Sequence, residues 1–164
     1  MKILCIDAGL RITGYVICEI VDFKIILIKE EEIKVYKKNT MQEKLNYIFE
    51  TLEKEIKRFQ PTALVIEKLY SHYKHPTTLG LLSQIIGIIN LLAYKFSLKI
   101  FEYPPTHAKK AILGKGNVRS FQVKKMAENI TNKTFKSTHT ADAFSLAIAF
   151  SNMQKIERLY DLKN

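Results

Sequence analysis

The sequence has 164 residues, a length that suits one domain with a single hydrophobic core, and we expect residues 1–164 to form one unit. Hydrophobic residues make up 47% of the chain and charged residues 26%, as in soluble globular proteins. The formal net charge of +10 favours a polyanionic partner, nucleic acid first and an acidic membrane surface second, unless the lysines are spread over a surface that binds neither.

Composition also excludes several classes of protein. The two cysteines, Cys5 and Cys18, lie inside predicted strands, which indicates reduced core residues of a cytoplasmic protein rather than a disulfide framework. Met1 leads directly into a short strand, so we expect no signal peptide. The longest apolar stretch, residues 79–92, is interrupted by glycine and polar residues and is too short and too mixed for a membrane span.

The start of the chain predicts a β-hairpin. Two apolar runs, residues 3–6 and 15–18, flank a polar turn that begins at Asp7. A carboxylate at the exposed end of a buried strand is held rigidly, which suits a metal ligand, but aspartate also commonly starts turns. Gly9 and Gly14 permit positive φ and the close approach of a backbone or a phosphate. The pattern leaves both interpretations of Asp7 open.

Three further elements follow the hairpin. A third strand is predicted at residues 23–28, with an extension to Ile33 whose charged side chains indicate an exposed edge. Residues 41–59 predict the clearest helix, because apolar side chains recur at helical spacing until Pro61 ends the pattern. The apolar run after this proline, residues 62–66, predicts a buried parallel strand.

Glu67 follows directly on that strand and is the second carboxylate at the end of a predicted core strand. A solvated pair with Lys68 would have no function, but two acids at the ends of two core strands favour a functional role. The next loop contains Tyr70 and Tyr73. These tyrosines suit stacking on nucleic-acid bases, on the order of 1–3 kcal/mol per contact, or else cover the edge of the core.

Residues 77–96 predict a helix that is apolar around nearly its whole circumference. Such a helix is either a central core helix or one that faces a second subunit, and the sequence leaves both possibilities open. A short strand at residues 98–101 follows, and we expect Pro104 and Pro105 to end it.

Basic residues gather in one segment of the chain. Residues 95–125 contain eight lysines and arginines against one acid, Glu102. The segment includes Gly114, Lys115 and Gly116, a flexible basic turn that suits a phosphate backbone. So one-sided a balance favours a nucleic-acid surface over an ordinary solvated face.

The C-terminal part predicts a short helix at residues 121–130, a polar loop at 132–138 and a last helix that runs from about residue 138 through 153. His139 and Asp142 are three residues apart and therefore lie on one face of its first turn. By itself this pair is an ordinary pattern at the edge of a core, typical of a capping or hydrogen-bonded histidine.

A candidate catalytic site emerges when these residues are combined: Asp7, Glu67, His139 and Asp142. Each stands at the end or the start of a predicted core element. Three carboxylates brought together repel one another, and divalent cations resolve that conflict. Hard oxygen ligands indicate Mg²⁺ or Mn²⁺. Two such ions roughly 3.5–4 Å apart activate a water and stabilise the leaving oxygen in phosphodiester hydrolysis.

Four segments of the chain, in order, resemble motifs of the RuvC family of Holliday-junction resolvases: ILCIDAGLRITGY, VIEKLY, FEYPPTHAKKAILGKG and HTADAFSLAIAF. They span nearly the whole chain. The resemblance implies an α/β, RNase H-like fold with a mixed five-stranded sheet and helices on both faces. It also implies a homodimer that makes paired nicks across a four-way DNA junction in recombination and repair. The expected products carry 5′-phosphate and 3′-hydroxyl ends, and a branch-migration helicase complex is an expected partner.

The same resemblance assigns roles to individual residues. The metal ligands fall on Asp7, Glu67, His139 and Asp142. Tyr70 takes the place of an aromatic residue that inserts at the junction centre, and Lys109 that of a lysine that contacts phosphate. We expect further phosphate contacts from Lys110, Lys115 and Arg119.

The chain departs from the family pattern at three positions. Ala8 stands where the family usually has proline, and His139 stands where many members have aspartate and others histidine. A basic position of the family falls on Ser120, beside which Arg119 is a substitute. Three other functions stay open, namely an RNase H-like nuclease that processes structured RNA, a non-catalytic nucleic-acid-binding protein, and a sugar-kinase-like ATPase. The last generally needs two such domains.

Overall fold

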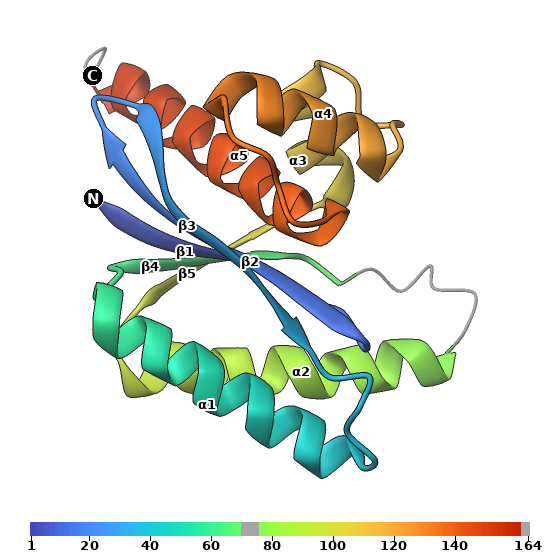
Figure 1. The fold of residues 1–164 in the computed structure, drawn as a ribbon. Coiled ribbons are helices and arrows are strands. Elements are labelled where there is room, and N and C mark those ends of the chain that lie inside the picture. Colours follow the sequence, from blue (N-terminus) through green and yellow to red (C-terminus); the bar gives the residue numbers. More distant parts are fainter. Residues whose placement is uncertain (70–75, 162–164) are drawn as a thin grey trace.

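The computed structural model describes residues 1–69 and 76–161. A mixed five-stranded sheet lies between two layers of helices (Figure 1). Its strands are β1 (Lys2–Asp7), β2 (Ile12–Val21), β3 (Lys24–Lys34), β4 (Ala63–Glu67) and β5 (Lys99–Tyr103). Their spatial order is β3-β2-β1-β4-β5, with β1 antiparallel to β2 and parallel to β4, and β4 parallel to β5.

The helices divide between the two faces of the sheet. One face is covered by α1 (Met41–Phe59) and α2 (Pro76–Lys95), and the other by α3 (Pro105–Leu113), α4 (Ser120–Thr131) and α5 (Thr138–Asp161). The expected α/β fold, with a mixed five-stranded sheet and helices on both faces, is therefore confirmed.

The central strand β1 contributes side chains to both hydrophobic cores, because successive side chains of a strand point to opposite faces of the sheet. Ile3 and Cys5 pack into the core beneath α5, whereas Leu4 and Ile6 pack into the core beneath α1 and α2. All four side chains are fully buried. The same alternation directs the next odd-numbered side chain, Asp7, toward the α5 face at the end of the strand.

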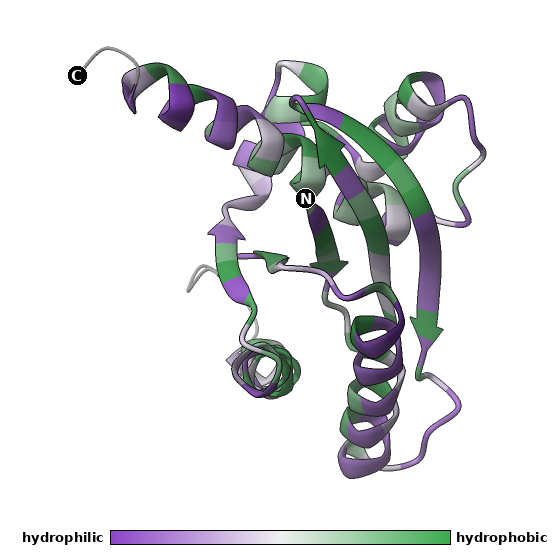
Figure 2. Ribbon diagram, turned by 90° about the vertical axis from the view of Figure 1, so that its left-hand side faces the viewer, coloured by the Kyte–Doolittle hydropathy of each residue, from purple (hydrophilic) through white to green (hydrophobic). Residues whose placement is uncertain are grey.

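Most predicted elements are confirmed with small changes of boundary. The helix over residues 41–59 has the predicted limits, because Thr40 and Glu43 form a reciprocal capping box and Gln60 ends the helix in a left-handed conformation before Pro61. The third strand extends through Ile33 and forms an edge of the sheet. Figure 2 shows α1 as polar on one side and apolar on the other, whereas α2 is apolar around most of its circumference.

Two predictions about the C-terminal half were incomplete. Pro104 and Pro105 were expected only to end a strand, yet Pro105 begins α3, since proline fits the first turn of a helix where no backbone donor is needed. Gly114 ends this helix with a φ of 72°, the only positive φ of a glycine among the described residues. The last helix, predicted through residue 153, continues to Asp161.

Two observations bear on the excluded classes. Cys5 and Cys18 are free and buried, as predicted. One described helix, α2, is long and apolar enough by length and composition alone to cross a membrane, a test that core helices of soluble proteins also pass.

Candidate active site

Asp7 and Glu67 leave the sheet at the same edge. Asp7 is the last residue of β1 and Glu67 the last of β4, and the two strands run parallel with Ile6 opposite Ile66. Because the carboxyl ends of parallel neighbours meet at one edge, the fold carries both acids there from positions 60 residues apart in the sequence.

The start of α5 brings His139 to Asp7. The Ser137 hydroxyl accepts a hydrogen bond from the backbone N–H of Thr140, and the Thr140 hydroxyl donates to the backbone carbonyl of Ser137, which fixes the first turn. His139 Nδ1 then lies 2.8 Å from Asp7 Oδ2. This hydrogen bond raises the pKa of His139 above its usual value, although partial burial opposes the shift.

Gly14 makes this approach possible. It lies opposite Asp7 in the β1–β2 pairing, and a Cβ atom at this position would stand 2.3 Å from the carbonyl carbon of His139. Any side chain here would therefore push the start of α5 off the sheet. The close approach expected at Gly9 and Gly14 is confirmed, but neither residue adopts a positive φ.

Glu67 and Asp142 carry the clearest electrostatic signature of the site. Burial first, and then the charges of Asp7 and Asp142, raise the pKa of Glu67 to about 7. Burial also raises the pKa of Asp142 to about 6, with a further contribution from Asp7. Lys109 opposes both shifts. The charge of Asp7 acts on both Glu67 and Asp142, and the charge of Asp142 acts on Glu67, so the fold brings the three predicted acids near one another.

The donor set suits a hard divalent cation. Asp142 Oδ1 is buried and has no hydrogen-bond partner in the described part of the chain. A buried oxygen without a partner is unfavourable, and coordination of a cation would remove this cost. Nevertheless, among the described residues no three His, Cys, Asp or Glu side chains already stand together as a formed metal cage. The Asp7 carboxylate is instead turned toward His139. A cation held by all three acids would therefore require side-chain rotation within the cluster.

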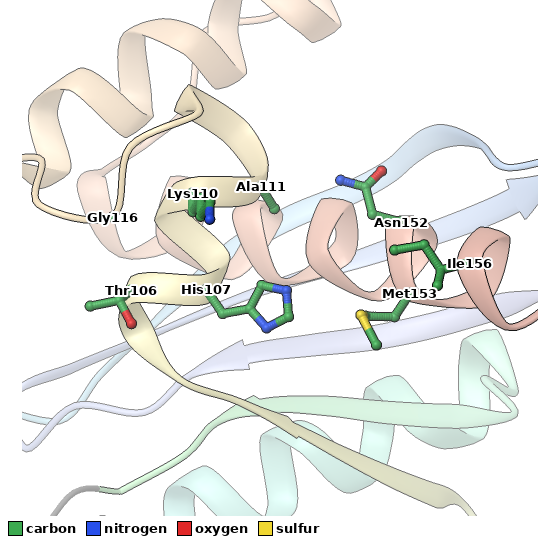
Figure 3. Close-up of a pocket in the computed structure, with 8 residues that line it drawn as sticks. All are labelled: Thr106, His107, Lys110, Ala111, Gly116, Asn152, Met153 and Ile156. Carbon is green, nitrogen blue, oxygen red and sulfur yellow. The ribbon is translucent and has the colours of Figure 1, made fainter.

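The predicted phosphate contacts fall in different places. Lys109 lies close enough to act on the pKa values of Glu67 and Asp142, whereas Lys110 lines a separate hollow of about 540 Å³ between α3 and the C-terminal half of α5 (Figure 3). None of the four predicted ligands lines this hollow. Lys115 and Arg119 are exposed in the connection between α3 and α4. The predictions for Tyr70 and Tyr73 lie outside the described residues.

Two residues of the site were not singled out as functional from the sequence. Glu32 lies opposite Gly14 in the β2–β3 pairing, and its charge helps to raise the pKa of His139. The Ser120 hydroxyl, at the start of α4, lowers the pKa of Asp142 by hydrogen bonding. Glu32 can be assigned to the site only from the pairing of β2 with β3. Ser120 stands out in the sequence only because the family has a basic residue at that position.

The strand order, with acids at the ends of β1 and β4 and at the start of the last helix, defines the RNase H-like class of nucleases. The family model described as crossover junction endodeoxyribonuclease RuvC matches residues 3–150. The RuvC protein of Chlamydia caviae is 32% identical over 155 residues, which is 92% of each chain.

Solved structures agree on the fold. The Thermus thermophilus RuvC structure is similar with a TM-score of 0.83 at 20% identity, over 96% of this chain and 97% of that one. A structure of T. thermophilus RuvC in complex with a Holliday junction substrate gives a TM-score of 0.83 at 19% identity, over 95% and 96% of the two chains. The chain belongs to the RuvC family, whose members are metal-dependent nucleases of the RNase H-like type.

Proposed function

We propose that this protein is an endodeoxyribonuclease that resolves four-way DNA junctions by paired nicks during recombination and repair. The observation that carries the proposal is the gathering of Asp7, Glu67, Asp142 and His139 from three distant segments, next to Lys109. Membership of the RuvC family and the likeness to a relative solved with a Holliday junction add support. The net charge of +10 suits a polyanionic substrate.

The residues divide the work of phosphodiester hydrolysis. Asp7, Glu67 and Asp142 would hold two Mg²⁺ or Mn²⁺ ions, which supply an activated water and charge stabilisation at the leaving oxygen. His139 completes the set as a ligand, with a general base as the alternative role, because Asp7 orients its Nδ1 and leaves Nε2 for either task. Lys109 neutralises part of the negative charge and orients the phosphate. The products carry 5′-phosphate and 3′-hydroxyl ends.

The deciding experiment compares three labelled substrates: a mobile four-way DNA junction, a DNA duplex of the same sequence and a structured RNA. We expect metal-dependent nicks at symmetric positions on two opposing strands of the junction, with little cleavage of the other substrates. Preferential cleavage of the RNA would favour an RNA-processing nuclease. Junction binding without cleavage in either metal would favour a non-catalytic binding protein.

His139 makes the reaction sensitive to pH and to the choice of metal. Imidazole is a softer ligand than carboxylate, so we expect faster cleavage with Mn²⁺ than with Mg²⁺. His139 has a raised pKa and Glu67 one of about 7, so both take up protons as the pH falls. His139 then loses the lone pair, and Glu67 the negative charge, that would bind a cation. The cleavage rate should therefore rise between about pH 5.5 and about pH 8.

The matched variant for this prediction is His139→Asp, which restores a carboxylate ligand. Its preference for Mn²⁺ should shrink, while the contribution of Glu67 to the pH profile should remain. Initial rates with each metal across the pH range provide the measurement. A flat profile with equal rates in both metals would remove His139 from the ligand set.

We further propose that the protein forms a homodimer through α2. Only 28% of the most apolar 18-residue stretch of this helix is buried within the chain. Leu91 and Tyr94 are 55% and 86% exposed on it, and, outside their own stretch of helix, no atom of the described residues lies within 4 Å of the side-chain positions at Gly80 and Gly87. An apolar helix with so much free surface requires a partner, and a second copy supplies the twofold symmetry that paired nicks need.

Leu91→Glu should convert this dimer to a monomer, because it places a charge in the apolar contact. Analytical ultracentrifugation measures the mass, and Asn46→Glu, on the exposed side of α1, provides the control for added charge. The monomeric variant should lose paired nicking. An unchanged mass would exclude α2 as the interface. A cytoplasmic location and a branch-migration helicase complex as a partner complete the proposal.

A further inference from the structure

An exposed aromatic side chain follows Ser120 at the start of α4. Phe121 is the second residue of α4 and is 58% exposed, whereas Val123 and Ala127 on the same helix are fully buried. The helix therefore packs through its other side, and no described contact of the fold requires a phenyl ring at this position. Large exposed aromatic groups of this kind mark binding surfaces more often than structural ones.

The position of Phe121 ties it to the catalytic cluster. It directly follows Ser120, whose hydroxyl lies close enough to Asp142 to lower the pKa of that carboxyl group. Arg119, on the other side of Ser120, is exposed. Lys125, four residues after Phe121, shares its helix face. The aromatic ring is thus flanked along the chain by two basic residues, one residue away from the hydroxyl that acts on Asp142.

Next to the ring is a hollow of about 300 Å³ between the end of α3 and the exposed side of α4. It is lined by Leu113, Phe121, Gln122, Lys125, Met126 and Asn129. The lining combines apolar surface, two side-chain amides and an ammonium group, and it includes no carboxylate. Such a surface is complementary to the flat face, the polar edge and the attached phosphate of one nucleotide.

We propose that Phe121 and this hollow form a subsite that stacks an unpaired base of the junction strand next to the cleaved phosphodiester. The proposal rests on the proposed function and names a contact within it. Lys125 pairs with the phosphate of the stacked nucleotide, and the Asn129 amide reaches the edge of the base. The subsite holds a strand opened at the junction centre and leaves a fully paired duplex unaffected, because paired bases do not expose a face.

The test measures binding without metal, so that it does not depend on catalysis. A four-way junction carries 2-aminopurine in place of adenine next to the cleavage position, and its fluorescence is recorded in EDTA as protein is added. With the wild-type protein we expect quenching by stacking. With Phe121→Ala the quenching should disappear and the affinity for the junction should fall about tenfold, while the affinity for duplex DNA stays unchanged.

Two further variants make the result specific. Phe121→Trp keeps a stacking surface and should retain both the quenching and the affinity. Ile130→Ala removes a side chain that is 51% exposed near the other end of α4 and should behave as the wild type. Circular dichroism checks that each variant is folded.

Each outcome either supports or overturns the proposed subsite. If Phe121→Ala binds and quenches as the wild type does, the subsite is overturned, and a different occupant, such as an apolar side chain of a protein partner, covers the ring. Equal weakening for junction and duplex also overturns it. Failure of the wild-type protein to bind or cleave junctions would instead reject the proposed function, which is a separate result.

Discussion

Asp7→Asn is expected to lower the rate of junction cleavage by about a thousandfold or more, while the affinity for the junction changes by less than about threefold. Asparagine keeps the size of the side chain but removes one of the negative charges proposed to hold the cations. The basic residues proposed to bind the DNA backbone, including Lys109, remain in place. Catalysis and binding therefore separate in this variant.

Single-turnover cleavage and a binding titration in EDTA measure the two quantities. Asp22→Asn is the matched control, since it makes the same chemical change at an exposed aspartate in the β2–β3 turn. A second readout follows from electrostatics. The charge of Asp7 helps to raise the pKa of Glu67 to about 7, so this pKa should fall in the variant. Near-normal nicking by Asp7→Asn would reject the assignment of Asp7.

Gly14→Val should have the second-largest effect, on activity and stability together. Its Cβ would stand 2.3 Å from the carbonyl carbon of His139 and 2.6 Å from the backbone nitrogen of Thr140, both of which are backbone atoms that cannot rotate away. The start of α5 must then move, which costs about 1–3 kcal/mol of stability by overpacking. His139 and Asp142 move with it, and we expect cleavage to fall about a hundredfold.

Thermal unfolding and cleavage rates test this expectation together. Asn46→Ala is the control, because Asn46 is exposed on α1, on the opposite face of the sheet from α5, and alanine favours a helix. This control should unfold at the wild-type temperature or above and cleave normally. If Gly14→Val retained both stability and activity, the tight contact between β2 and α5 would not be what positions His139.

Much of the fold follows from local patterns in the sequence. The apolar spacing and Pro61 predict both limits of α1, and the apolar run that ends at Glu67 predicts a buried parallel strand. The sequence does not predict α3 as long as Pro104 and Pro105 are interpreted only as the end of a strand. Proline also starts helices, and Pro105 is the first residue of α3. Ala108 and Ile112 are buried on its inner face, and their spacing of four residues is typical of a helix. The many basic residues of this segment make that apolar spacing hard to see in the sequence.

The candidate site was more predictable in its acids than in its surroundings. Asp7 and Glu67 are conspicuous in the sequence because a charged residue at the end of a buried strand is unfavourable unless it has a partner or a function. Glu32 does not stand out, since it lies in a charged segment of an edge strand, and only strand pairing places its charge where it raises the pKa of His139. Contacts between distant segments of this kind depend on packing that no local pattern encodes.

The raised pKa of Glu67, about 7, has a consequence for how the protein takes up its cofactor. Near neutral pH this carboxyl group holds a proton for about half of the time. With Glu67 as a ligand, as proposed, uptake of a divalent ion would be an ion exchange in which hydrogen ions are released to the buffer. The apparent metal affinity is therefore coupled to acidity, and the heat of loading measured in different buffers contains a contribution from each buffer's own ionisation.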